Sequence, residues 1–414
     1  MYILGLTFPI GWNASACLLK DGKLLSFIEE ERLNRFRYCH RVPALEGMDY
    51  CLQQAGISLD DVKHVAFGWD HGIKLWPHFN PRRYIIRRFL LRMYGPDIRQ
   101  KTLHFQNHHL SHVASSYFCS DFGESNFISI DSSGGDTSGL LGVARGAKLQ
   151  VLHKFPVDQS WGYVYENLTE AIGFLPHREE GKTMGLAALG QPDLSKFGFI
   201  HWDGELPHID LAAFKSYLRT LNYRKRGEPL NDHHKFIAAT VQAALEKACI
   251  MMARWLHKRT GVRRISLAGG CALNCSTNGR LAMLDEVDEV YVQPASHDAG
   301  TSLGAALLTH ADLTGERPKP QMVTPHMGPE YSNEEIHKAI LKCRWNSYKL
   351  SQDIASDVAD ILVQKKVVGW FQGRLEAGPR ALGGRSILGD PTQADMKDII
   401  NKQIKGREPW RPFA

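Results

Sequence analysis

The sequence predicts an α/β protein in which two similar halves form a first domain and a smaller domain follows. Three observations support this: a strand–turn–hairpin pattern that occurs twice, helical stretches after each copy, and a polar, proline-bearing segment near residue 320. At 414 residues the chain is also longer than one ordinary core allows, so two or three domains are expected.

The first copy of the pattern is the N-terminal segment MYILGLTFPIGWNASACLLKDGKLLSFIEEERLNR, residues 1–35. An apolar strand and a turn precede two strands joined by Asp21-Gly22, a dipeptide typical of tight hairpins. The second copy, NFISIDSSGGDTSGLLGVARGAKLQVLHKF, begins at Asn126, and its hairpin turn is expected near Gly146-Ala147. Duplicated α/β halves that face each other across a cleft are the layout of the actin-like ATPase class, to which actin and the sugar kinases belong.

The later elements are read in the same way. Residues 233–260 have apolar side chains at helical spacing, and this helix should stop at Gly261. A strand over 265–268 then ends at Gly269-Gly270, and a helix should start near Asn274. A glycine-rich turn between strand and helix can offer N–H groups to a nucleotide phosphate, or it can be needed only for packing. Spacing alone leaves both interpretations open.

The stretch TGERPKPQMVTPHMGPEYSN, residues 314–333, is the predicted linker. It separates a first domain of 1–325, with halves of about 1–105 and 106–325, from a second domain of 335–414, where a helix over 351–364 and a strand VVGWF are expected. The second domain carries GRLEAGPRALGGRSILGD, residues 373–390. Arginine forks and glycine N–H groups together suit an anion, but ion pairs such as Arg374–Glu376 or Arg385–Asp390 would explain the same loop.

Composition and charge disfavour several classes of function. Fifty basic against 44 acidic residues give a net charge of +6, which fits local anion sites better than a nucleic-acid surface. The arginine-rich segment Pro81–Gly95 is interpreted as a surface helix rather than a membrane anchor. Eight scattered cysteines, of which only Cys271 and Cys275 are close, favour a reducing cytoplasm over a disulfide or zinc site. No signal peptide and no run of about 18 apolar residues is present, so no membrane span is expected.

The strongest metal signal is NHHLSH, residues 107–112. His108 and His112 are four residues apart and would share one helix face, as two imidazoles on one ion do. His109 would point elsewhere, either to substrate or phosphate or only to a supporting contact.

Two aspartates could complete the metal site. Asp131 and Asp298 each follow an apolar strand and could face the same cleft. The alternatives are a turn cap for Asp131 and an N-cap for Asp298 in front of a helix that begins near Gly300. Two histidines with two aspartates would suit iron, manganese or zinc rather than calcium.

The segment EEGKTMGLAALG, residues 179–190, resembles a phosphate loop only superficially, because Pro176 stands where the first glycine of that motif belongs. Lys182 could still pair with a phosphate, and Gly181 would allow a ligand to approach closely. A buried turn with an exposed lysine is the competing interpretation.

Taken in order, these segments resemble the O-carbamoyltransferases of the nodulation and antibiotic-tailoring type. The resemblance rests on EEERLNR (29–35), NHHLSH (107–112), SIDSSG (129–134), EEGKTMGLAALG (179–190), AGGCALN (268–274), QPASHDAGTSLGAA (293–306), GRLEAGPRALGGRSILGDP (373–391) and KGREPWRPFA (405–414). It implies an actin-like first domain similar to the metal-dependent tRNA threonylcarbamoyl-transfer proteins. The second domain would be similar to threonylcarbamoyl-adenylate synthases of the YrdC type.

The resemblance also implies a reaction. The second domain would convert carbamoyl phosphate and ATP to carbamoyl adenylate, and the first would transfer the carbamoyl group to a hydroxyl of a sugar or natural product. It implies a divalent metal, Fe(II) before Mn or Zn, on His108, His112, Asp131 and Asp298. The catalytic residues it implies are His109, Lys182, Arg380 and Arg385. The implied nucleotide and phosphate contacts are Gly181, Gly269, Gly270, Asn274, Gly300, Lys405, Arg407 and Arg411.

Two departures from the family pattern limit these expectations. Family members usually carry a histidine near the first hairpin, whereas this chain has FPIGWNAS with Trp12 and Asn13, so a different or more apolar acceptor pocket is expected. Relatives also continue past RPFA, and about 75 residues after the linker are too few for a full adenylate-forming domain. We therefore expect an incomplete YrdC-like domain, either C-terminally truncated or completed by another chain; a homodimer is a separate expectation. The alternatives are a nucleotide- and metal-binding remnant and a tRNA-modifying transferase.

Overall fold

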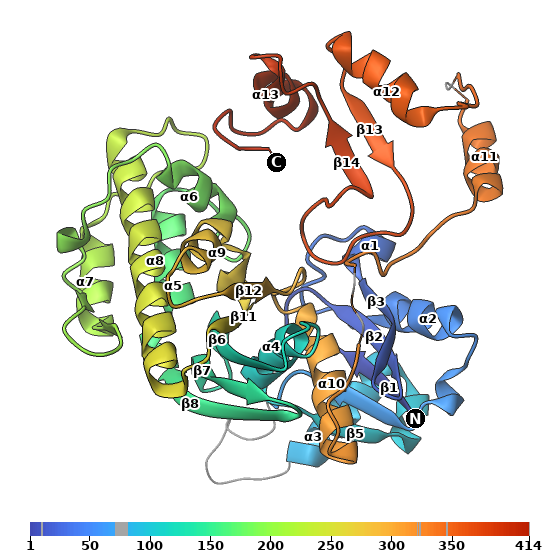
Figure 1. The fold of residues 1–414 in the computed structure, drawn as a ribbon, viewed down its shortest axis with the longest axis horizontal. Coiled ribbons are helices and arrows are strands. Elements are labelled where there is room, and N and C mark those ends of the chain that lie inside the picture. The colour runs from blue at the N-terminus through green and yellow to red at the C-terminus, as the bar shows by residue number, and fades with distance from the viewer. Residues whose placement is uncertain (10, 71–81, 321, 323, 345–346, 414) are drawn as a thin grey trace. The chain divides into compact units, whose positions relative to one another are not determined.

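The computed structural model describes residues 1–9, 11–70, 82–320, 322, 324–344 and 347–413. The chain divides into two compact units, Met1–Val323 and Thr324–Ala414, drawn from blue to orange and from orange to red in Figure 1. The division falls within the predicted linker and close to the predicted boundary at residue 325.

The first half of unit 1 is built on a five-stranded sheet of order β3-β2-β1-β4-β5. Strand β1 pairs antiparallel with β2 and parallel with β4, and β4 pairs parallel with β5. The turn between β2 and β3 has φ values of 50° at Asp21 and 75° at Gly22, so the predicted tight hairpin is confirmed. The strands are β1 (Tyr2–Leu6), β2 (Ser15–Lys20), β3 (Lys23–Glu29), β4 (His64–Phe67) and β5 (Thr102–Phe105).

The second half repeats this sheet, with order β12-β11-β6-β7-β8. Strand β6 pairs antiparallel with β7 and parallel with β11, and β11 pairs parallel with β12. Numbered within each half, both sheets therefore read 3-2-1-4-5 with the same strand directions, and the predicted actin-like duplicated fold is confirmed. The strands are β6 (Glu124–Gly134), β7 (Thr137–Arg145), β8 (Lys148–Pro156), β11 (Arg264–Ala268) and β12 (Glu289–Val292); β9 (Ile200–His201) and β10 (His208–Ile209) form a separate small sheet.

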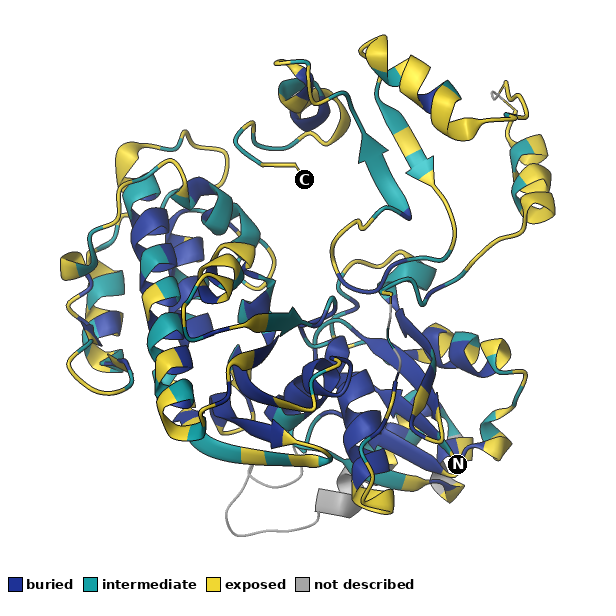
Figure 2. Ribbon diagram, in the orientation of Figure 1, coloured by how far each residue is buried: buried dark blue, intermediate teal, exposed yellow. Residues whose placement is uncertain are grey.

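The helices of unit 1 pack on these sheets, and Figure 2 shows the sheets and the helices between them as largely buried. They are α1 (Glu31–Asn34), α2 (Leu45–Gln54), α3 (Arg82–Tyr94), α4 (His108–Tyr117), α5 (Trp161–Ala171), α6 (Glu180–Ala187), α7 (Leu211–Thr220), α8 (Asp232–Thr260), α9 (Cys275–Ala282) and α10 (Gly300–Thr314), with short helices η1 (Leu59–Asp61), η2 (Pro96–Gln100), η3 (Val157–Gln159), η4 (Leu194–Lys196) and η5 (Gly270–Leu273). Pro81 and the side chains of 82–87, which belong to the arginine-rich segment, lie outside the described residues.

Helix α10 corrects the predicted division into halves. The sequence assigned residues 106–325 to the second half, but α10 packs against β1, β2 and β4 of the first sheet and against α4, which covers the second sheet. The physical reason is that α10 is buried from Gly300 to Ala311 and therefore needs partners all round. The two halves meet along α4 and α10.

Helix α8 is the long helix predicted over 233–260. The side chain of Asn231 caps its first turn, and Gly261 ends it with a φ of 69°. Its length and apolar composition would also suit a membrane span, but 67% of its apolar window is buried inside the protein, as in the core helix of a globular domain.

Unit 2 is smaller and buries fewer side chains. Its two strands pair antiparallel, and Val358, Ala377, Met396 and Ile400 form much of its buried apolar interior. Its elements are α11 (Asn333–Lys342), α12 (Ile354–Val363), β13 (Val368–Phe371), β14 (Arg385–Leu388), α13 (Met396–Asp398) and the π-helix η6 (Ile399–Ile404). The expected likeness to a YrdC-type domain stays a prediction.

Candidate active site

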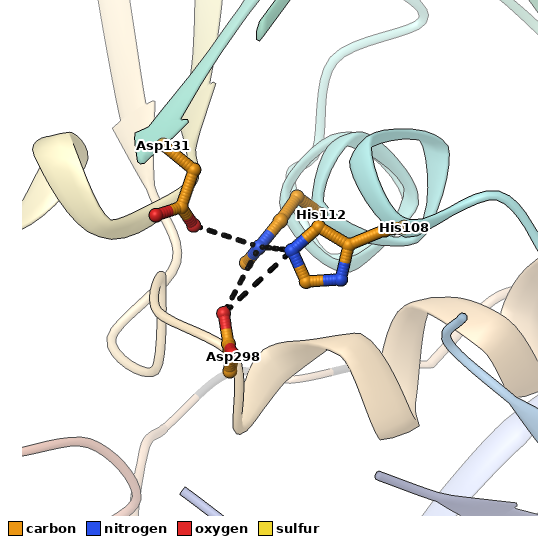
Figure 3. A group of neighbouring side chains, drawn as sticks. All are labelled: His108, His112, Asp131 and Asp298. Atoms are coloured by element: carbon orange, nitrogen blue, oxygen red, sulfur yellow. Dashed lines mark hydrogen bonds and ion pairs between the residues drawn. The ribbon is translucent and has the colours of Figure 1, made fainter. Parts of the chain in front are cut away.

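Four predicted metal ligands meet in unit 1. His108 and His112 come from successive turns of α4, Asp131 from β6, three residues before its end, and Asp298 from the loop before α10. Figure 3 shows the four side chains pointing toward one another. One ligand atom from each lies within 4.8 Å of all the others. Asp298 is not the side-chain cap of α10, which was the alternative for this residue, because the N-cap position is Ala299.

The spacing of these atoms fits one metal ion. The Nε2 atom of His112 lies 3.1 Å from His108 Nε2, 3.2 Å from Asp131 Oδ2 and 3.6 Å from Asp298 Oδ1. Neighbouring ligands about 2.1 Å from a common ion lie roughly 3.0–3.4 Å apart. The distances from His112 to His108 and Asp131 fall in this range, whereas Asp298 Oδ1, which is also 3.7 Å from His108 Nε2, lies slightly farther away. His108 Nδ1 lies 3.3 Å from the carbonyl oxygen of Gly68, a contact that leaves Nε2 available as the ligand atom. Imidazole and carboxylate together suit Fe(II), Mn(II) or Zn(II).

The electrostatics of the site also favour a cation. Burial lowers the pKa of His112, but hydrogen bonds to Asp131 and Asp298 outweigh burial and raise this pKa to about 9. Burial raises the pKa of Asp131, yet the hydrogen bond and charge of His112 hold it well below its usual value. Both shifts reflect negative charge on two carboxylates beside the imidazoles, which a divalent ion bound here would compensate.

The glycine turn after β11 holds one of these ligands. The N–H of Gly270 donates to Asp131 Oδ2 at 3.0 Å. Gly269 has a φ of 87°, and a Cβ atom there would lie 2.3 Å from the carbonyl oxygen of Ile130. These contacts support the packing interpretation of the turn, and the Gly270 N–H is used by Asp131. The phosphate contact through this turn stays a prediction.

Two other predicted nucleotide contacts have structural roles. The side chain of Asn274 caps α9 by accepting from the N–H of Thr277 at 3.0 Å, and it exchanges hydrogen bonds with Gln242. A nucleotide contact through this side chain would have to break those bonds. At Gly300 a Cβ atom would lie 2.3 Å from the carbonyl oxygen of Ala295, so the glycine is needed for packing at the start of α10.

His109 and Lys182 are also held inside the unit. His109 is fully buried, with Nε2 3.0 Å from the carbonyl oxygen of Thr137 and Nδ1 3.3 Å from Ser129 Oγ. The predicted catalytic contact to substrate is therefore corrected to the supporting contact that was its alternative. Lys182 Nζ lies 2.8 Å from Glu179 Oε1, so this ammonium has a carboxylate partner rather than standing free for a phosphate. Gly181 lies in the first turn of α6.

The loop 373–390 of unit 2 does form an anion cradle, but a carboxylate of the same chain occupies it. Glu376 Oε1 accepts from the N–H groups of Leu382, Gly384 and Arg385 at 3.1, 2.7 and 2.9 Å. The Arg385 guanidinium lies 3.5 Å from the ring centroid of Phe371 and donates to backbone carbonyls. Arg385 therefore stabilises the loop, which corrects its predicted role as a free catalytic cation.

Four other cations of unit 2 lie close together. Burial lowers the pKa of Lys405, and the charges of Arg407 and Arg411 lower it further. Burial and Arg411 lower the pKa of Arg407, and Arg380 adds to this effect. The lowering shows that these positive charges are near one another. Glu408 acts in the opposite direction on Arg407, and Arg407 also donates to Asn401 Oδ1 at 2.6 Å.

A group of residues beside the metal ligands was missed by the sequence analysis. Ser132 donates from its N–H to Asp131 Oδ1 at 2.7 Å and from its hydroxyl to Glu166 Oε2 at 2.8 Å. The other oxygen of Glu166 contacts Nδ1 of His177. These residues come from separate segments, so no spacing in the sequence could have indicated that they meet.

Comparison with known proteins identifies the family. A family model described as the carbamoyltransferase N-terminus matches residues 83–307, a range that includes all four metal-site residues. The chain belongs to the carbamoyltransferase family. A second model, described as the carbamoyltransferase C-terminus, matches residues 359–414.

Relatives of this chain include bacterial nodulation proteins. Nodulation protein NolNO of Sinorhizobium fredii is 34% identical over 97% of this chain and 62% of its own length. Nodulation protein NolO of Bradyrhizobium diazoefficiens is 38% identical over 74% of this chain and 57% of its own length. The chain thus spans less than two thirds of either relative. Among solved structures, HypF of T. kodakarensis gives a TM-score of 0.49 at 15% identity over 76% of this chain and 48% of that chain.

Proposed function

We propose that this protein transfers a carbamoyl group from carbamoyl phosphate, by way of carbamoyl adenylate, to a hydroxyl of a small molecule, with ATP consumed in forming the adenylate. The observation that supports this most is the two-histidine, two-aspartate cluster where the halves of unit 1 meet, in a chain of the carbamoyltransferase family. We infer that the acceptor is a sugar or another natural product and that the reaction takes place in the cytoplasm.

The residues of unit 1 would hold and orient the reacting groups. Bound by His108, His112, Asp131 and Asp298, a divalent ion would act as a Lewis acid toward the carbamoyl group. The N–H of Gly270 fixes the orientation of Asp131, and α4 keeps the two imidazoles on one face. Because these groups are fixed before substrate arrives, little reorganisation would oppose the reaction.

The cations of unit 2 would neutralise phosphate charge. Arg407 lies close enough to Arg380 and Arg411 for both charges to lower its pKa, and Arg407 and Arg411 likewise lower the pKa of Lys405. We infer that carbamoyl phosphate or the triphosphate of ATP binds there, as expected for a YrdC-like adenylate-forming domain.

Metal binding can be tested without the reaction. We expect His108→Ala to abolish stoichiometric binding of Fe(II) or Mn(II), measured by elemental analysis after dialysis, because one of four ligands is removed. His201→Ala, at an exposed histidine of β9, is the matched control and should keep the metal. An unchanged metal content in His108→Ala would refute the metal site.

The reaction is tested with purified protein, ATP, carbamoyl phosphate and Fe(II). Formation of carbamoyl adenylate should release phosphate and pyrophosphate in equal amounts, and His108→Ala should retain this release while losing transfer to an acceptor. Metal binding without release of either product would instead identify a nucleotide- and metal-binding protein that does not form the adenylate.

A further inference from the structure

An aromatic and basic cluster lies where the two halves of unit 1 approach each other near the metal ligands. Trp12, Tyr38 and His40 come from the first half, and His177 and Arg178 from the second; these five residues are called the Trp12 cluster. The ring of Trp12 stacks on that of His40, with centroids 3.9 Å apart and planes at 9°, and lies 5.4 Å from the ring of His177.

Arg178 is held in place by this cluster. Its guanidinium carbon lies 5.5 Å from the ring centroid of Trp12 and 5.4 Å from that of Tyr38. The Tyr38 hydroxyl donates to the carbonyl oxygen of Arg178 at 3.2 Å. Two aromatic contacts restrict the long side chain, so a ligand that binds the guanidinium loses less conformational entropy than it would at a mobile arginine.

The backbone of the cluster is strained. Left-handed φ values occur at Asn13 (52°), Tyr38 (67°), Cys39 (36°), Arg41 (59°) and His177 (61°), where side chains are disfavoured. Hydrogen bonds hold this conformation: the N–H of Asn13 donates to Tyr38 at 2.8 Å, and that of Arg41 donates to Gly11 at 3.1 Å. Strain of this kind persists where the surrounding structure imposes it and is concentrated at ligand sites.

The Trp12 cluster is connected to the metal ligands. His177 contacts Glu166, and Glu166 accepts from the Ser132 hydroxyl at 2.8 Å, while the Ser132 N–H donates to Asp131. The side chain of His177 is 46% exposed and that of Glu166 only 12%, so the imidazole remains accessible while its carboxylate partner is enclosed. A molecule bound at the cluster would lie next to the metal centre.

Besides the pair of His177 with Glu166, two arginines carry positive charge at the cluster. Within the described residues, Arg41 and Arg178 are exposed and form no ion pair with an acidic side chain. Both cations lie close enough to His40 to lower its pKa, after the larger effect of burial. The nearby Glu31 is already used, because it accepts from the N–H of Tyr38 at 2.6 Å.

We propose that the Trp12 cluster recognises an oxyanion, a carboxylate or a phosphate, on the acceptor molecule and so places the acceptor hydroxyl beside the metal centre. The proposal rests on the proposed function, because that function supplies the acceptor molecule. The planar fork of Arg178 matches the two oxygens of such a group, and Arg41 adds a second cation. A neutral sugar would leave these charges uncompensated and would bind more weakly.

The test measures binding of three sugars to the full chain by isothermal titration calorimetry. The sugars are D-glucuronate, D-glucose 6-phosphate and neutral D-glucose. We expect at least one of the anionic sugars to bind at least tenfold more tightly than D-glucose, and the comparison between them shows whether a carboxylate or a phosphate is preferred. Arg178→Gln should weaken that binding at least tenfold, and Arg178→Lys should have an intermediate effect because it keeps the charge without the fork. Arg219→Gln, at an exposed arginine of α7, is the control and should leave binding unchanged.

Several outcomes would overturn the proposal. Equal binding of D-glucose and the anionic sugars, or no effect of Arg178→Gln, would exclude oxyanion recognition. Equal competition by inorganic sulfate at the same concentration would indicate a non-selective basic surface, and loss of sugar binding in saturating AMP would assign the cluster to nucleotide phosphate. If circular dichroism shows that Arg178→Gln does not fold, Arg41→Gln serves as the test variant in its place. Absence of pyrophosphate release with intact glucuronate binding would count against the proposed function alone.

Discussion

The variant Gly304→Ala tests the close contact between α4 and α10. A Cβ atom at residue 304 would lie 1.7 Å from the carbonyl oxygen of Ser111 and 2.5 Å from its carbonyl carbon. Ordinary contact between carbon and other heavy atoms requires about 3.5 Å, so the two helices would have to move apart by roughly 1.5 Å or more. A backbone carbonyl cannot rotate away as the end of a side chain can.

Two effects should follow from this displacement. Overpacking in a close-packed core costs about 1–3 kcal/mol, and we expect a value of about 3 kcal/mol here because backbone must move. The same displacement separates His108 and His112, on α4, from Asp298, two residues before α10. Metal sites tolerate distance errors of only about 0.2 Å, so metal affinity should fall as well.

The assay combines urea unfolding of the metal-free protein with the metal content of the loaded protein. Gly279→Ala is the matched control, because residue 279 lies inside α9 with no atom within 4 Å of an added Cβ. That variant should be stabilised by about 0.5–1 kcal/mol and should keep its metal. Wild-type unfolding and wild-type metal content in Gly304→Ala would refute the described helix contact.

Two further predictions concern carboxylates. Burial raises the pKa of Glu180 from its ordinary value of 4.5 to about 7, so the folded protein holds this proton more tightly than the unfolded chain, and the free energy of unfolding should fall as the pH rises from 5 to 8. In Glu180→Gln this decrease in the free energy of unfolding should disappear. The variant should be more stable than the wild type by roughly 3 kcal/mol at pH 8 and should differ little from it at pH 5. Identical pH profiles of the two proteins in urea unfolding would contradict this prediction. Glu376→Ala should leave the N–H groups of Leu382, Gly384 and Arg385 unpaired and speed their hydrogen exchange, with a cost of about 2 kcal/mol to unit 2. Unchanged exchange at these three amides would show that Glu376 does not organise the loop.

The features that could be predicted from the sequence are set by neighbouring residues. Asp21-Gly22 specifies its hairpin through backbone conformations that few other dipeptides adopt. The face shared by His108 and His112 follows from helix periodicity alone. The duplicated sheets could be predicted because each half repeats the same local pattern of strand and hairpin.

The features that were missed depend on contacts between distant segments. Arginine and glycine in the loop 373–390 indicated an anion cradle correctly, but the sequence could not show that Glu376 fills it. The glycine turn at 269–270 looked like a phosphate site because its use by Asp131, 139 residues away, is a tertiary contact. The Trp12 cluster combines segments from both halves; FPIGWNAS indicated a different acceptor pocket, but the sequence could not show that Trp12 meets His177 and Arg178.

The placement of α10 has a consequence for how the chain acquires its structure. The first sheet begins at Tyr2, yet the helix that covers β1, β2 and β4 ends at Thr314. During synthesis the apolar face of this sheet therefore stays uncovered until nearly all of unit 1 has been translated. Contacts of such long sequence separation fold slowly and leave apolar strands open to aggregation or to chaperones in the meantime. We therefore expect that the first half, although complete as a sheet by residue 105, does not fold independently.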